Sequence, residues 1–423
     1  MTARRTIPEQ VSAVLMAVLM VVTCLIAVSC NNKRKKEPDL LKQGAMNTAS
    51  FGFDKKFLLQ NDKSLVELTD DEAAILVSPK YQAKVFTSTT GGDEGRSLGW
   101  INYKAFSAKP DPHMNGYGGE NRFWLGPEGG KSSVFFAPGD SMVYDNWKTP
   151  APFDTEAWRL VKSDKKTAVL SKDARIRNFL GTYLEMNVLR TVSIQNREQI
   201  ESALGINIHD SIKYVGYTTQ NVLKNTGDEA WNDTTGVPFI WILDMFHVSP
   251  STVIVVPHKA APKGEKVVTS DYFNSPDKSR LKIENNVVLF KADGKFRSKL
   301  GIRPEYALPV AGSYDPARQV LTVTYFSVDS TAQYVNNLWT TAGPDYNGDA
   351  MNVYNDGPLA DGSQMGPFYE IESVSPGAFL NAGESISHRH DVYHFSGSEK
   401  FLDSIATKLL HVDIRTIRRA FRH

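Results

Sequence analysis

Residues 237–246, VPFIWILDMF, and residues 251–257, STVIVVP, are the stretches that decide the fold. Both are short and apolar at consecutive positions, which is typical of strands buried on both faces within stacked sheets. Runs of similar composition, separated by Gly, Pro, Asn and Asp, are YQAKVFTST 81–89, KSSVFFAPG 131–139, TAVLSKD 167–173, TYLEMNVLRTVSIQN 182–196, NVVLFKADG 286–294 and QVLTVTYFSV 319–328. This spacing predicts an all-β sandwich of antiparallel sheets.

Helical periodicity is confined to a few segments. One helix is expected from Arg197 to Leu204, and a second near the C-terminus, where LDSIATKLL 402–410 has apolar residues at helical spacing. Asp413 is placed to cap a last basic turn, IRTIRRAFR 414–422. No internal repeat and no change of composition follows residue 50, so we expect one domain over residues 46–423.

The N-terminus is typical of an export signal. Arg4 and Arg5 precede an almost wholly apolar run over residues 11–28, which ends at Ala27-Val28-Ser29-Cys30. Small residues directly before a cysteine resemble a lipobox, in which the cysteine receives a lipid. We therefore expect a signal peptide over residues 1–30, lipidation of Cys30 and a polar linker over 31–45; the alternative is an uncleaved membrane anchor.

Charge and cysteine content exclude several classes of protein. The chain has 48 Lys and Arg against 47 Asp and Glu; residues 1–36 carry five net positive charges, which leaves about −4 for the rest. The body is therefore not a nucleic-acid binder. The basic run at 33–36 is either an attraction to anionic headgroups or a solvated linker. The only cysteines are Cys24 and Cys30, so the body has no disulfide and holds together by burial.

A glycine-rich loop over residues 116–130 is the first candidate binding segment. It holds Asn121, Arg122, Trp124 and Glu128 between glycines that allow tight turns. Arg and Asn donate to hydroxyls or carboxylates, and Trp offers a flat face to a sugar ring. The alternative is a structural turn in which Arg122 pairs with Glu128.

Two carboxylates near the C-terminus form the second candidate. If residues 368–374 are a strand, Glu370 and Glu372 share one face, and their repulsion raises the pKa of one and suits it to acid or base work. His388 and His390 share a face in the same way. We expect these two histidines near the ligand, with metal binding or a plain sheet face as alternatives.

Motifs for metal binding and for covalent catalysis are weak in this sequence. Asp345, Asn347, Asp349 and Asp356 have part of the spacing of a calcium loop, but Ala350 stands where that loop needs Gly. No HExxH motif occurs, the GxSxG spacing is met only by Gly95-Arg96-Ser97-Leu98-Gly99, and the body has no thiol. We expect no metal and no cofactor, and neither serine nor thiol catalysis.

The C-terminal residues resemble the aldose 1-epimerase, or galactose mutarotase-like, superfamily. The resemblance lies in Ile371-Glu372-Ser373, the turn at 380–384 and the aromatic strand at 393–395, with weaker likeness at 223–231 and 241–243. Residues 118–130 resemble an uncharacterised Bacteroidota-type lipoprotein branch. The resemblance implies a large antiparallel β-supersandwich with a C-terminal helix and a sugar-sized groove.

The same resemblance assigns roles to residues. The general base falls on Glu372, with Glu370 as second choice, and Arg122 corresponds to the arginine that holds the substrate. The family's acid is a mid-chain His, for which the region offers His209, His247 and His258.

From these residues we expect an exported, monomeric lipoprotein that binds carbohydrate, at the periplasmic face of the cell envelope or on the outer surface. The alternatives are an active aldose epimerase that uses Glu372 as base, and a structural envelope protein whose site is lost. A base and an acid are both needed to open and reclose a hemiacetal.

Overall fold

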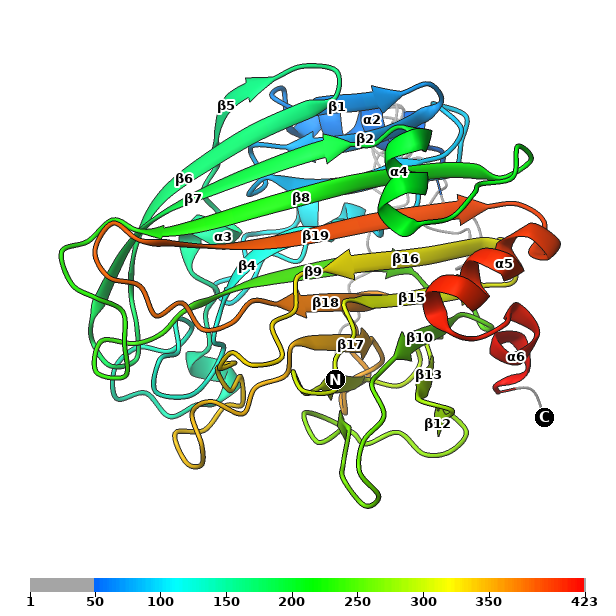
Figure 1. Ribbon diagram of the computed structural model, residues 1–423. Helices are drawn as coiled ribbons and strands as arrows, with labels where there is room; N and C mark the ends of the chain where they lie inside the picture. Colours follow the sequence, from blue (N-terminus) through cyan, green and yellow to red (C-terminus); the bar gives the residue numbers. More distant parts are fainter. Residues whose placement is uncertain (1–48, 422–423) are drawn as a thin grey trace, which may run out of the picture. The chain divides into compact units, whose positions relative to one another are not determined.

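The computed structural model describes residues 49–421 (Figure 1). The expected signal peptide, the lipid on Cys30 and the linker lie outside these residues. Within them, no helix is long and apolar enough to cross a membrane.

The described residues form three antiparallel sheets. The smallest has the order β1-β2-β3, with β1 Val66–Asp70, β2 Ala73–Ser78 and β3 Lys84–Thr89. The largest has the order β12-β13-β10-β15-β16-β19-β8-β7-β6-β5. Its strands are β12 Leu281–Glu284, β13 Val287–Lys291, β10 Val253–Pro257, β15 Val310–Asp315, β16 Val320–Phe326, β19 Ser385–Ser396, β8 Lys213–Asn225, β7 Tyr183–Ile194, β6 Thr167–Arg177 and β5 Arg159–Ser163.

The third sheet has six strands in the order β11-β14-β17-β18-β9-β4. Its strands are β11 Val268–Thr269, β14 Ser298–Ile302, β17 Met351–Asn355, β18 Phe368–Val374, β9 Phe239–His247 and β4 Arg122–Gly126. The helices are α2 Phe51–Asn61, η2 Tyr103–Ser107, η3 Tyr144–Asn146, α3 Ala151–Asp154, α4 Arg197–Leu204, α5 Glu399–Leu410 and α6 Ile414–Arg419.

The main core lies between the ten-stranded and six-stranded sheets. Ile371 of β18 and Ile242 of β9 belong to the same buried cluster as Val392 of β19 and Leu223 of β8. Alternate residues of each strand point into this core, as expected for two packed sheets. The predicted antiparallel β-supersandwich with a C-terminal helix is therefore confirmed.

Helices α4, α5 and α6 cover part of the other face of the ten-stranded sheet. Ile200 and Leu402 pack in one cluster with Leu321 and Val323 of β16 (Figure 1). The helix predicted over 197–204 is α4, which has the same bounds, and the second predicted helix lies within α5. Asp413 caps α6 as predicted, since its side chain accepts a hydrogen bond of 2.8 Å from the Thr416 backbone N–H.

The segment 131–139 was predicted as a strand, and this is wrong. It forms turns and bends, although Val134, Phe135 and Phe136 are all buried. The ring of Phe135 stacks on Trp147 with centroids 5.4 Å apart. The apolar run is therefore buried by aromatic packing of a loop, which composition alone does not distinguish from a strand.

Candidate functional site

The face of the six-stranded sheet that points away from the ten-stranded sheet, its outer face, carries the candidate site. One row of paired residues runs Asn352, Glu372, Leu243, Arg122 over strands β17, β18, β9 and β4. The row before it runs Lys299, Tyr354, Glu370, Met245, and the row after it Val374, Trp241, Trp124. Side chains of one strand face are neighbours across adjacent strands, so these three rows meet in one cluster.

Arg122 reaches diagonally over β9 to the first carboxylate. Its Nη2 donates a short hydrogen bond to Glu370 Oε1, and the two side chains are 7% and 9% exposed. Burial raises the pKa of Glu370 to about 8; the Arg122 cation opposes this rise and the nearby Glu372 adds to it. The predicted repulsion between two carboxylates on one strand face is therefore present, but burial is the larger cause.

Glu372 is held from two sides at the base of the cluster. Its Oε2 accepts hydrogen bonds from Lys299 Nζ at 2.8 Å and from Trp241 Nε1 at 2.9 Å. The side chain of Glu372 is 1% exposed and that of Lys299 is 8% exposed. All four side chains are buried, and the slight exposure that remains belongs to the two cations and Glu370 rather than to Glu372.

Indole rings lie on one side of these charges. Trp124 packs edge-on against Trp241 with centroids 5.6 Å apart. The Arg122 guanidinium lies 5.3 Å from the Trp124 ring, and Lys299 Nζ lies 4.7 Å from the Trp241 ring. Both cations thus contact a carboxylate and an aromatic face, which fixes them more firmly than the ion pairs alone.

Glu128 belongs to the same cluster but does not pair with Arg122, so the alternative of a structural turn closed by that pair is not found. Burial raises the pKa of Glu128, while the Lys299 cation opposes the rise and Glu372 adds to it. The structure therefore brings together Arg122, Trp124, Glu128, Glu370 and Glu372, as the sequence predicted.

Asn121, His388 and His390 lie on the other side of the sheet, in the main core, and are fully buried. Asn121 donates to Asp244 at 2.6 Å, and His390 Nε2 lies 2.8 Å from the other oxygen of Asp244. Ser373 Oγ lies 2.7 Å from both His388 Nε2 and His390 Nδ1. These three predicted ligand contacts are therefore separated from the carboxylate pair by the sheet itself.

Ser373, His390 and Asp244 form a serine–histidine–aspartate chain, but it is sealed. All three are 0% exposed, so no substrate can approach the hydroxyl. This chain is part of the core packing, and it gives no support to a hydrolase mechanism.

The three histidines considered as acids lie elsewhere. His209 stacks on Phe401 of α5, His258 bridges to Ala307, and His247 ends β9 opposite Phe368. Among residues 49–421, no group of three or more His, Cys, Asp or Glu side chains is placed to hold a metal ion. In the weak calcium pattern, Asp345 pairs with Lys131 and Asp349 accepts from Tyr272.

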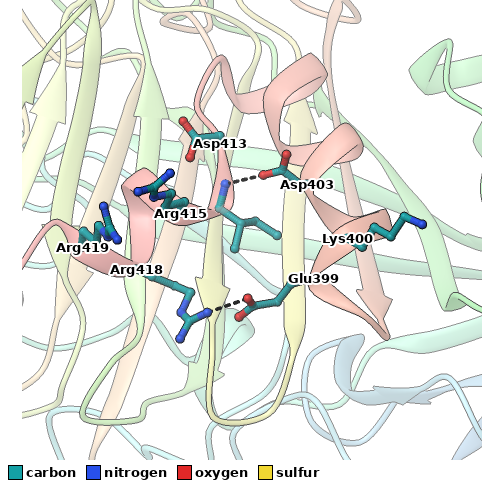
Figure 2. Close-up of a pocket in the computed structure, with 8 residues that line it drawn as sticks. Glu399, Lys400, Asp403, Asp413, Arg415, Arg418 and Arg419 are labelled. Carbon is teal, nitrogen blue, oxygen red and sulfur yellow. Dashed lines mark hydrogen bonds and ion pairs between the residues drawn. The ribbon is translucent and has the colours of Figure 1, made fainter.

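Among residues 49–421, the two larger grooves lie away from the cluster. One of about 680 Å³ lies between α5 and α6 and is lined by charged side chains, of which Arg418 Nη1 pairs with Glu399 at 2.6 Å (Figure 2). Another of about 580 Å³ lies between α4 and the ten-stranded sheet and is lined mainly by hydroxyl and amide side chains. Neither is lined by a binding or catalytic residue predicted from the sequence.

Sequence reasoning missed Lys299 and Trp241, the two donors to Glu372. Lys299 is a single charged residue in a short strand, and Trp241 stands within a continuous apolar run, so neither carries a local sign that it faces a carboxylate. Their strands are also distant in sequence from β18, and only the sheet order brings them to it.

Comparison with known proteins gives the family. A family model described as a family of unknown function (DUF6786) matches residues 49–421. The chain belongs to this family. No curated protein matches the chain.

Solved structures similar to this member of the family include galactose mutarotase-like proteins, as the sequence resemblance predicted. One from Lactobacillus casei ATCC 334 is 10% identical, with 78% of this chain and 100% of that chain covered and a TM-score of 0.43. A galactose mutarotase related enzyme from Lactobacillus acidophilus is 8% identical, with 78% and 97% covered and a TM-score of 0.41. A protein from Synechocystis sp. PCC 6803 is 12% identical, with 79% and 96% covered and a TM-score of 0.46. At these scores the function has to be argued from the site.

Proposed function

We propose that this protein binds a carbohydrate on the outer face of the six-stranded sheet. The observation that carries the proposal is the carboxylate pair, in which Glu370 and Glu372 stand side by side and each holds a buried cation beside an indole ring. Sugar hydroxyls both donate and accept hydrogen bonds, so they match a cluster in which carboxylate acceptors alternate with Arg and Lys donors.

An apolar strip completes the match. Leu243 lies between Arg122 and Glu372 in the same row, and Met245 follows it on β9. A pyranose has apolar C–H faces and a polar rim, and binding sites for small molecules combine an apolar lining with a few placed polar groups. The strip and the two indoles supply that lining.

Aldose epimerisation, the second function considered, receives less support from the geometry. The base Glu372 has Lys299 Nζ and Trp241 Nε1 on its Oε2, and no histidine in residues 49–421 contacts it. Ammonium and indole groups are much weaker acids than imidazolium. Binding without turnover is therefore the function that these contacts favour.

Replacing Arg122 by Ala should weaken saccharide binding at least tenfold, because a charge-assisted donor contributes about 1.5–3 kcal/mol. The measurement is calorimetric titration of wild type and variant against a panel of mono- and oligosaccharides. Arg159→Ala, which removes an exposed arginine of β5, is the matched control and should leave affinity unchanged.

Unchanged affinity in Arg122→Ala, or no saccharide binding by the wild type, would sink the proposal. Since Arg122→Ala leaves Glu370 without its cation, a melting curve accompanies each titration. Arg122→Lys, which keeps the charge and loses the planar fork, is the second variant and should show a smaller loss.

We further propose that a lipid on Cys30 holds the body at the membrane. Cys30→Ser should move most of the protein from the membrane fraction to the soluble fraction of cells that express it. Cys24→Ser, within the apolar run, is the matched control and should leave the protein in the membrane fraction. Identical fractionation of the two variants would contradict lipidation and favour an uncleaved anchor.

A further inference from the structure

Strand β3 extends the candidate face beyond β4. Val85 and Asn121 form an antiparallel bridge, with N–H to carbonyl distances of 3.0 Å in both directions. The next pair in this register is Lys84 opposite Arg122, at the kind of position where cross-strand side chains lie closest. The two side chains also flank one glycine, since a Cβ added at Gly119 would lie 3.4 Å from Lys84 Cδ and from Arg122 Cγ. Lys84 is therefore the next member of the row that holds Glu372 and Arg122.

Lys84 is a buried lysine without a carboxylate partner in the described part of the chain. It is 4% exposed, its Nζ donates to Gln82 Oε1 at 3.1 Å, and the Tyr117 ring lies 5.4 Å away. Lysine is almost never fully buried unless it is paired. Burial lowers the pKa of Lys84 to about 7, the Arg122 cation lowers it further, and Asp154 opposes the shift.

The backbone that presents Lys84 adopts an uncommon conformation. Gln82 and Ala83, directly before it, have φ values of 56° and 53°. Two successive residues other than glycine in the left-handed region are strained, and such strain gathers at functional sites. The Ala83 carbonyl is also fixed, because Arg190 Nε donates to it at 3.1 Å. This turn joins β2 to β3 and fixes where β3 begins, and with it the position of Lys84 beside Arg122.

Arg122 has donor capacity left over. Its Nη2 bonds Glu370, while its Nε is buried and has no hydrogen-bond partner among residues 49–421. Within the described part of the chain, the two adjacent buried cations therefore have one ion pair, from Arg122 to Glu370, and Asp154 acts on Lys84 without forming an ion pair with it. A negatively charged group between Lys84 and Arg122 would satisfy both, through charge-assisted hydrogen bonds.

We propose that Lys84 and Arg122 together bind an anionic substituent of the ligand, so that the protein recognises a carbohydrate bearing a carboxylate, sulfate or phosphate group. This inference rests on the proposed function and sharpens its ligand class. Glu370, on the far side of Arg122, keeps the anion at the Lys84 end by repulsion.

The test compares neutral sugars with their acidic counterparts. The full chain, in detergent at pH 6.5 and fixed ionic strength, is titrated with glucose and galactose, with their uronic acids, and with their 6-sulfates and 6-phosphates. We expect at least one acidic member to bind ten times more tightly than its neutral parent, and the three acidic forms show which anionic group is preferred. Acidic sugars that bind no more tightly than neutral ones would overturn this inference and leave carbohydrate binding standing, whereas no binding by any saccharide would overturn both.

Variants then assign the preference to Lys84. Lys84→Met should lower affinity for the preferred acidic sugar at least tenfold and for its neutral parent less than twofold. Lys84→Arg, which keeps a cation, should retain part of the preference, and exposed Lys104→Met is the control. Equal losses for acidic and neutral sugars in Lys84→Met would show a structural role and reject the assignment.

Discussion

Asp244→Ala should lower the free energy of unfolding by about 3–5 kcal/mol, the range expected when one partner of a buried charged pair is removed. Asp244 is 0% exposed and joins strands of both packed sheets: it contacts His390 of β19 and accepts from Asn121. Asn121 in turn accepts from Arg190, a fully buried arginine of β7. Removing the carboxylate therefore leaves Nδ2 of Asn121 and Nε2 of His390 each without a hydrogen-bond partner in the core, and takes a negative charge away from the buried Arg190.

Urea denaturation of wild type and variant measures this loss. Asp244→Asn keeps one acceptor oxygen and most of the volume, so it should be the milder change. Asp228→Ala, at an exposed aspartate in the turn after β8, is the matched control and should shift stability by less than about 0.5 kcal/mol. A loss below about 1 kcal/mol in Asp244→Ala would mean that water replaces the carboxylate, which the sealed geometry does not allow for.

The carboxylate pair was predictable because it needs only local information. Strand β18 has the predicted bounds, and a period of two places Glu370 and Glu372 on one face whatever the rest of the chain does. The β-sandwich class was predictable for a similar reason, since short buried runs with turn residues between them recur along the chain.

The face of the sheet on which each predicted site residue lies was not predictable. Asn121 and Arg122 are neighbours in sequence, and the interpretation of 116–130 as one loop placed both at the ligand. Asn121 forms a bridge to β3 and Arg122 begins β4, so this segment is extended and the two side chains point to opposite faces. His388 and His390 share a face as expected, but that face is the core, since the alternate residues Ser387 and Arg389 are the exposed ones.

Lys84 and Lys299 were missed for another reason. They join the site through pairings between segments distant in sequence: β3 with the residue before β4, and β14 with β17. A single lysine in an apolar run carries no local signal that distinguishes a snorkelling surface residue from a buried one. Only the register places each cation against the site.

Lys84→Met should make the protein more stable at pH 7, by about 2 kcal/mol or more. Burial holds the pKa of Lys84 at about 7 in the folded protein, against 10.5 for an ordinary lysine, and each pKa unit corresponds to about 1.4 kcal/mol. The groups that face it are Arg122, which disfavours its charge, Asp154, which favours it, and the Tyr117 ring and Gln82 amide, which are neutral. Methionine fills a similar volume without an amine to desolvate.

The pH dependence separates this cause from a general gain in packing. Below pH 7 both the folded and the unfolded chain carry the Lys84 proton, and the folded state bears the full cost of the buried charge. Between pH 7 and 10.5 the unfolded chain still binds that proton while the folded protein has released it, so the contribution of this lysine to wild-type stability rises with pH. The advantage of Lys84→Met in urea denaturation should therefore be largest at pH 6 to 7 and shrink towards pH 10.

A variant that is less stable than wild type at pH 7, or whose advantage is constant with pH, would show that Lys84 is paired in the folded protein. We expect Lys84→Met both to stabilise the protein and to remove the preference for acidic sugars. That combination would show that Lys84 serves ligand binding and lowers the stability of the free protein.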